Sequence, residues 1–363
     1  MADIFRICIL LLITMQLAKA QSVNTISIVE KRLSLDTHSI LTIPEGNPYM
    51  TGIYFFNQKQ YVQALAYFEG MDTNFLPTGI HYLTGSVHQQ LGNYNLASQA
   101  YLQDHRIKPG RSAYKMAQCF ASLQEANLAL NWLDTAYKYQ NRFSRSAVLT
   151  DSHFVAIRHN WKLRKGIKRY TSRSGEKAIA KAERKLKQGN TALAMAYINH
   201  ALKKRPDMPD WYNLKARLTM QMQEYDLARK LLYTEAEYRP FDKSGAYLHI
   251  ASTYLNEGQL HKGIIWSLMA LNEDSLQLSL LPHIAELYII DNQYNQAQAV
   301  LDKYLTDVPA DHYAHFLKAL LANDTQTGLL ELNIAIYLSK QQTANVPIKY
   351  YDLLGELSMK TSQ

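Results

Sequence analysis

The sequence predicts an all-α protein that is built as a solenoid of repeated helix–turn–helix units. The first observation is a spacing in which Tyr is followed by Ala three residues later and by Pro fifteen residues later; it begins at Tyr94, Tyr225 and Tyr294. The second is a helical spacing of apolar residues on both sides of a polar turn. The third is a period of 34 residues, which separates Pro206 from Pro240. Such a period is typical of helical repeat proteins.

The composition is that of a folded chain with little capacity for disulfide or metal chemistry. The 363 residues are 47% hydrophobic and 19% charged, which is ordinary for a globular rather than a disordered protein. Two cysteines, Cys8 and Cys119, are too few for a disulfide framework or a thiolate zinc site. We expect Cys119 to be a buried small hydrophobe.

Residues 1–20 have the pattern of a cleaved export signal. Arg6 precedes an apolar run at 7–17, and Ala18-Lys19-Ala20 forms a small-x-small cleavage site. A short membrane anchor is the alternative, but the run is well below the roughly 20 apolar residues that span a bilayer. We therefore expect cleavage after Ala20, a periplasmic location and a mature protein that does not span a membrane.

The repeat is clearest at 208–240, where both halves have helical spacing around Gln223-Glu224. The apolar residues of this segment are Trp211, Leu214 and Leu218 in the first half and Leu227, Ala228, Leu231 and Leu232 in the second.

Two helices in 34 residues with a closing proline resemble the tetratricopeptide repeat (TPR) family. In that family a small residue lies where each helix approaches another, and a proline ends the unit. The matching positions here are Gly85, Ala216, Ala251 and Ala285 in first helices, Ala97, Ala194, Ala228 and Ala297 in second helices, and Pro109, Pro206, Pro240 and Pro309. An unrelated helical bundle is the alternative.

The resemblance implies a right-handed superhelix with a concave surface lined by the first helices. We expect a signal peptide at 1–20, a lead segment at 21–44 and about three repeats at 45–140. These repeats should be followed by a basic helical insert at 141–174, by four repeats plus a degenerate one at 175–340, and by a capping helix at 341–363.

Family positions also indicate which residues face the concave surface. They are Tyr82, Gln89, Asn213, Arg217, Ser252, Asn256 and Glu286. The Lys- and Asn-rich clamp that some members use for a C-terminal carboxylate is missing, since Asn213 and Arg217 are only a fragment of it. Mixed polar and apolar side chains suit an extended peptide or a partner helix. Plain surface is the alternative for each position.

Positive charge is concentrated in and just after the insert. Residues 141–187 contain 14 Lys or Arg and three acids, a sum of +11, so with a total of +8 the rest of the chain sums to −3. The predicted anion-binding patch is Arg158, Lys162, Arg164, Lys165, Lys168 and Arg169. A solvated basic face is the alternative.

The insert itself resembles a non-consensus helical pair that follows bacterial TPR units, with an Asp-x-x-Phe turn at Asp151. We expect it to be packed onto the array by Phe154, Ile157, Trp161, Leu163 and Ile167. Trp161 and Tyr170 could stack on sugar rings, but packing is the favoured role for Trp161.

No enzymatic motif is present, and His81/His88 and His312/His315 lack a third metal ligand. We therefore expect no catalytic residue, cofactor or metal. The leading hypothesis is a scaffold that holds partner proteins in the cell envelope, in an assembly or a surface-polymer secretion system. The alternative is binding of an anionic polysaccharide, peptidoglycan or a lipid surface through 141–187. Nucleic acid is not an expected partner, because of the export signal.

Overall fold

The computed structural model describes residues 46–71, 77, 79–170, 172–274, 277–343 and 345–360. In this part of the chain all regular secondary structure is helical, which confirms the predicted all-α class. The predicted signal peptide and the whole of the predicted lead segment lie outside the described residues.

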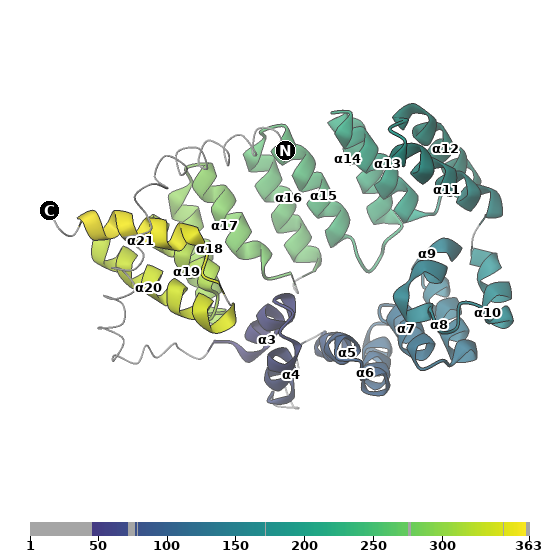
Figure 1. The fold of residues 1–363 in the computed structure, drawn as a ribbon, viewed down its shortest axis with the longest axis horizontal. Coiled ribbons are helices and arrows are strands. Elements are labelled where there is room, and N and C mark those ends of the chain that lie inside the picture. Colours follow the sequence, from purple (N-terminus) through teal and green to yellow (C-terminus); the bar gives the residue numbers. More distant parts are fainter. Residues whose placement is uncertain are drawn as a thin grey trace. The chain divides into compact units, whose positions relative to one another are not determined.

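Within the described residues, seven pairs of consecutive helices pack together and resemble TPR units (Figure 1). The helices before the insert are α3 (Pro48–Asn57), α4 (Tyr61–Glu69), α5 (Ile80–Gln90), α6 (Tyr94–Ile107), α7 (Ala113–Ser122) and α8 (Ala126–Lys138). Those after it are α11 (Arg173–Lys187), α12 (Thr191–Lys204), α13 (Pro209–Gln221), α14 (Tyr225–Glu237), α15 (Ser244–Asn256), α16 (Leu260–Glu273), α17 (Leu280–Ile290), α18 (Tyr294–Asp307), α19 (His312–Leu321) and α20 (Thr325–Gln342), followed by the single helix α21 (Ile348–Lys360).

The chain divides into two compact units. One comprises the described residues of Phe55–Gln277, and the other comprises the described residues up to Tyr54 together with those from Leu278 onward. The boundaries of these units are set by contacts between residues and do not coincide with the predicted repeat blocks at 45–140 and 175–340. The repeat blocks therefore remain a prediction.

Small residues lie where the two helices of a pair meet. The predicted alanines of both helices are at most 2% exposed, and Gly85 is buried. A Cβ added to Gly85 would lie 2.7 Å from the ring of Tyr101 in α6, too close for any side chain. The four predicted prolines follow the ends of α6, α12, α14 and α18, where they cannot continue a helix.

One turn is shared by six of these seven pairs and by the link between α3 and α4, and the middle of its three linking residues is left-handed. Its φ lies between 57° and 78° at Lys59, Gly92, Gln124, Gly189, Gln223, Gly258 and Asn292. The next residue donates its N–H to the carbonyl five positions earlier, at 2.8–2.9 Å in every case. This bond is the signature of a Schellman C-cap. The α19–α20 turn differs, since Ala322 is extended and the side chain of Asp324 caps the start of α20.

The insert folds into four short helical segments with their own caps. They are α9 (Arg145–Thr150), η2 (Ser152–Phe154), α10 (Trp161–Gly166) and η3 (Ile167–Tyr170). The side chains of Ser144, Asp151 and Asn160 accept hydrogen bonds from backbone N–H groups one or two residues inside the first three segments. The insert is therefore structured, as expected, rather than a loose linker.

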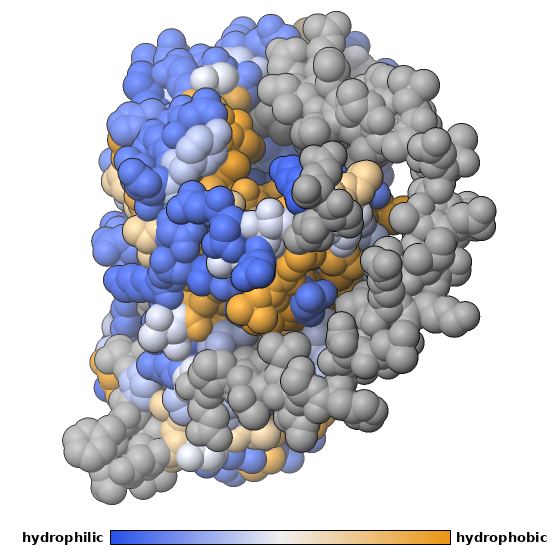
Figure 2. Space-filling model, turned by 90° about the vertical axis from the view of Figure 1, so that its left-hand side faces the viewer, coloured by the Kyte–Doolittle hydropathy of each residue, from blue (hydrophilic) through white to orange (hydrophobic). Residues whose placement is uncertain are grey.

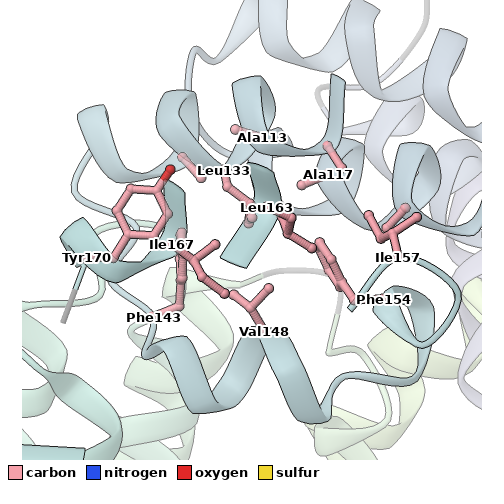
Figure 3. Close-up of a cluster of buried hydrophobic side chains, with 13 residues drawn as sticks. Ala113, Ala117, Leu133, Phe143, Val148, Phe154, Ile157, Leu163, Ile167 and Tyr170 are labelled. Carbon is pink, nitrogen blue, oxygen red and sulfur yellow. The ribbon is translucent and has the colours of Figure 1, made fainter. Parts of the chain in front are cut away.

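A hydrophobic core holds the insert against α7 and α8 (Figure 3). Predicted packing is confirmed for Phe154, Ile157, Leu163 and Ile167, each at most 5% exposed. It is wrong for Trp161, which is 66% exposed. Leu163 and Ile167 lie four residues apart on the inner face, and Trp161, two residues before Leu163, points away.

Tyr170 is buried, whereas stacking on a sugar ring requires an exposed aromatic ring. It is only 2% exposed, it stacks on Tyr137 at 4.9 Å, and its hydroxyl contacts Asp134. Tyr170 is thus a core residue, and Trp161 is the exposed aromatic of the insert.

In the second compact unit, the start of α3 is joined to helices near the end of the chain. The Asn47 N–H and the Thr51 hydroxyl both donate to the Asp307 carbonyl, at 2.9 and 3.2 Å. The Tyr54 hydroxyl donates to Gln342 Oε1 at 2.6 Å. Residues more than 250 positions apart therefore form one packed body.

Helix α21 packs against α20 and α19. Tyr350 stacks on Phe316 with ring centroids 4.6 Å apart, and Leu354 is buried. Apolar side chains nevertheless remain at the surface of this unit, where Leu330, Ile348 and Met359 are more than half exposed. The face of the molecule in Figure 2 shows an apolar area bordered by hydrophilic side chains.

The left-handed turn predicts opposite effects of one substitution at two glycines. Neither Gly258 in the α15–α16 turn nor Gly355 in α21 has any atom within 4 Å of an added Cβ. Gly258→Ala should lower the free energy of unfolding by about 1 kcal/mol, because Ala disfavours a φ of +74°. Gly355→Ala should raise it by roughly 0.5–1 kcal/mol, because Ala is the better helix former.

Thermal unfolding followed by circular dichroism measures both variants. Shifts of the same sign at the two positions would contradict the turn geometry.

Candidate partner-binding site

The compact unit Phe55–Gln277 holds a cavity of about 550 Å³. Helices α5, α7 and α9 contribute to its lining, together with the loops after α6, α8 and α14 and the end of α16. These elements are far apart in the sequence, so the cavity is a product of helix stacking rather than of a local motif.

The lining of the cavity includes cationic side chains. Arg111 pairs with the buried Asp104, and Arg142 lies 3.4 Å from Asp207 and stacks over the Tyr137 ring at 4.2 Å. Lys115 differs from both arginines, because it forms no ion pair with any described residue. Burial lowers the pKa of Lys115, although Asp151 partly opposes this. A partly buried ammonium group without a paired anion is ready to accept one from a ligand.

The lining also includes an anionic group of carboxylates that surrounds one arginine, Arg239. Arg239 contacts Asp210 at 2.5 Å, Glu235 at 2.9 Å and Asp242 at 4.0 Å. Burial raises the pKa of Asp242, and the neighbouring Asp274 raises it further, whereas Arg239 lowers it. Excess negative charge therefore remains around Asp242 and Asp274.

Tyr82 lies between these charges, as its electrostatics show. Burial and then Asp242 raise its pKa to about 12, while Arg111 lowers it. The Tyr82 hydroxyl is therefore protonated at neutral pH and can donate a hydrogen bond into the cavity.

The arrangement suits a ligand that carries both signs of charge. An anionic group can reach Lys115, and a cationic group can reach the carboxylates near Asp242. Aromatic residues Tyr114, Phe143 and Phe241 supply apolar contact area.

Two of the predicted concave residues lie at these cavities. Tyr82 lines the main cavity, and Asn213 lines an adjoining one of about 260 Å³ with Glu235 and His249. Asn213 Nδ2 donates to Glu235 Oε2 at 2.9 Å, so its amide is already engaged. Arg217, one turn further along α13, is exposed.

The other predicted concave residues are dispersed. Ser252 and Asn256 are half-buried on α15. Glu286 belongs to the other compact unit, and contacts with His283 hold its pKa below the usual range. The structure therefore does not bring the seven predicted residues into one site.

Gln89 is buried and contacts the insert instead of solvent. Its side-chain oxygen accepts from the Tyr101 hydroxyl at 2.7 Å, and its Nε2 lies 2.8 Å from His153 Nε2. Gln118 in α7 donates to Asp151 at 2.8 Å. The turn at Asp151 and His153 thus covers part of the face that the resemblance assigned to a partner.

The six predicted anion-binding residues are all exposed, on or near α10 and η3. Arg169 pairs with Asp134 at 2.5 Å and stacks over Tyr170. The other five, Arg158, Lys162, Arg164, Lys165 and Lys168, form no ion pair with a described residue.

The sequence reading missed Lys115, Arg142, Arg239 and Asp242. Three of these lie in loops that follow second helices. The family positions used for the prediction lie on first helices, so they could not identify loop residues. The available signal was the charge in Asn141-Arg142-Phe143 and in Arg239-Pro240-Phe241-Asp242, both of which follow second helices.

The described residues contain one thiol, which is buried. Burial raises the pKa of the Cys119 thiol to about 12, so this thiol is not a nucleophile at neutral pH, and the expected buried cysteine is confirmed. No group of three His, Cys, Asp or Glu side chains in this part of the chain is placed to hold a metal ion. Among the same residues, every helix is too short or too polar to cross a bilayer.

Substitution of Arg239 tests the role of the carboxylates around it. Glu235 is only 3% exposed, and burial raises its pKa, while Asn213 and Arg239 lower it. In Arg239→Met the carboxylate loses its cation, and we expect the free energy of unfolding to fall by roughly 2 kcal/mol at neutral pH.

The loss should depend on pH with a definite sign. A raised carboxyl pKa means that the folded state binds the proton more tightly than the unfolded state, so stability falls as pH rises through that pKa. The free energy of unfolding of Arg239→Met should fall more steeply with pH than that of the unmodified protein, so the difference between the two grows as pH rises. Urea unfolding across pH 4–8 measures this difference. The double variant Glu235→Gln, Arg239→Met should recover most of the lost stability. An equally unstable double variant would assign the loss to packing of the arginine.

No family model and no curated protein matches the chain. Solved structures similar to it include the C-terminal part of a TPR repeat-containing protein from Cytophaga hutchinsonii, with 13% identity and a TM-score of 0.42 over 74% of this chain and 98% of that one. PilF of Pseudomonas aeruginosa has 14% identity and a TM-score of 0.37 over 68% and 97%. The TPR2AB domain of yeast Sti1, in its complex with pHSP90, has 15% identity and a TM-score of 0.29 over 67% and 96%. The helix pairs and their repeated turn lead to the same conclusion: the chain is an all-α protein of paired helices that resembles the TPR solenoids.

Proposed function

We propose that this protein is a non-catalytic scaffold that holds a partner protein through the cavity of the unit Phe55–Gln277. The observation that carries the proposal is that side chains of both charges line one cavity. Lys115 presents an ammonium group that forms no ion pair with a described residue, and Asp242 and Asp274 belong to the same lining. Opposed charges of this kind select a partner by orientation as well as by fit.

The partner chemistry that fits is an extended peptide segment with an acidic and a basic side chain. The acidic group would pair with Lys115, and the basic group would lie near Asp242. Tyr82 would donate a hydrogen bond to a backbone carbonyl between them. A cavity of about 550 Å³ accommodates a few residues rather than a folded domain.

We also propose that the scaffold works in the bacterial cell envelope, in an assembly or a surface-polymer secretion system. The pattern of residues 1–20 supports this location, and the partner would then be an envelope protein.

A photocrosslinker at Tyr82 tests the cavity. Replacing Tyr82 with p-benzoylphenylalanine should capture one specific protein in the native cell. Lys115→Glu in the same chain should reduce the capture at least about tenfold, because like charges then oppose each other. A crosslinker at the exposed Tyr294, which is outside the cavity, is the positional control. Lys303→Glu, on the exposed side of α18, is the charge control. Capture that is insensitive to Lys115→Glu would refute the assignment.

The location has a separate test. The protein recovered from the periplasmic fraction should begin at Gln21, as determined by intact mass and N-terminal sequencing. Recovery of a cytosolic chain that still carries residues 1–20 would contradict the envelope role and leave the cavity assignment untouched.

A further inference from the structure

The outer side of α10 and η3 combines one exposed tryptophan with cations. Leu163 and Ile167 are buried against α8 and the insert core, so their side of this segment is occupied. Trp161, Lys165 and Lys168 follow each other at intervals of four and three residues, which places them on one outer face. Lys162 and Arg164 flank this face and are exposed.

These cations are not neutralised by the protein. Within 158–187 only Arg169 forms an ion pair with a described residue, although twelve Lys or Arg occur there. The only acids in this range are Glu176 and Glu183, and Glu176 accepts a hydrogen bond from the Ser146 N–H in the insert. The face therefore keeps its positive charge and attracts anions.

Trp161 distinguishes this face from an ordinary solvated basic surface. It is 66% exposed, whereas Trp211 is buried and Trp132 and Trp266 are half-buried. The Lys162 ammonium lies 5.9 Å from its ring centre, so the indole is flanked by charge rather than covered. A large amphipathic ring left in water among Lys and Arg is the combination that anchors proteins at the headgroup level of a bilayer.

We propose that the face formed by Trp161, Lys162, Arg164, Lys165 and Lys168 docks onto a bilayer surface that contains anionic lipids. Trp161 enters the headgroup region, and the four cations lie among the lipid phosphates. The apolar side of α10 and η3 remains in the protein core, so the segment rests on the membrane without inserting as a helix.

The aromatic content favours a bilayer over a polyanionic chain. Proteins that bind single-stranded nucleic acid use several aromatic rings in a row for stacking. Residues 158–187 contain two aromatic side chains, and Tyr170 is buried, so Trp161 has no exposed aromatic neighbour in this range. A single ring beside cations suits a continuous surface of headgroups.

The charges set the expected response to lipid and salt. Each Lys or Arg near an anionic membrane adds to the attraction, which decays over a Debye length of about 8 Å at physiological salt. Binding should therefore require anionic lipid and weaken as salt rises.

The test uses the full mature chain and sedimentation with vesicles. One set contains equimolar phosphatidylcholine and phosphatidylglycerol, and the other contains phosphatidylcholine alone. We expect binding only to the first set, with a blue shift in tryptophan emission. Trp161→Phe should abolish the shift, because Trp161 is the only exposed tryptophan of the four and the others lie outside this face.

Four substitutions test the charges. The variant Lys162→Gln, Arg164→Gln, Lys165→Gln and Lys168→Gln should bind the anionic vesicles on the order of a hundredfold more weakly. The matched control removes the same charge from the exposed Lys203, Lys204, Lys230 and Lys303 and should bind like the unmodified chain. Circular dichroism establishes that both variants are folded.

Three results would overturn the proposal. Equal binding to neutral vesicles would remove the electrostatic basis, and binding without a change in Trp161 emission would remove the anchor. Binding to dextran sulfate or duplex DNA as tight as to anionic vesicles would assign the face to soluble polyanions. None of these results bears on the cavity, because its lining and this face share no residue.

Discussion

The structure depends on the close approach of two helices at a small residue. At Gly85 the neighbouring ring of Tyr101 occupies the space of a Cβ, and at Ala97 the side chain is fully buried. A pair packed this closely is too thin to bury its own apolar surface, so it must stack on the next pair. The stacking then decides where the loops lie, and the loops supply most of the charge in the cavity.

Part of the fold could be predicted from the sequence, because some positions in each helix pair accept only one kind of residue. Alanine and glycine at the crossing and proline after the second helix are such requirements, and the structure confirms them. The left-handed turn was not readable, because Lys59, Gln124 and Gly92 all occupy equivalent positions there. The turn is defined by a backbone conformation and a hydrogen bond, and neither demands a single side chain. Trp161 was misassigned because helical spacing alone does not say which apolar residue of a short segment faces the core.

The cavity was less predictable than the helices. Tyr82 was expected on a concave surface, and it lines the cavity. Its charged neighbours Arg142 and Asp242 were not expected, since each follows the end of a second helix, and no local pattern links positions 100 residues apart. The insert had a further effect that spacing could not reveal. Its turn at Asp151 satisfies Gln118 and Tyr114, polar groups that an open groove would have offered to a partner.

The bonds from Thr51 to Asp307 and from Tyr54 to Gln342 change how this chain can assemble. In an open repeat array each pair meets only its neighbours, so folding can begin anywhere and spread. Here the two bonds span 256 and 288 residues, which gives the compact unit a high contact order and a large loop-closure entropy. On the ribosome, α3 emerges long before α18 and α20 exist. The start of this helix must therefore wait for the end of synthesis before it reaches its place.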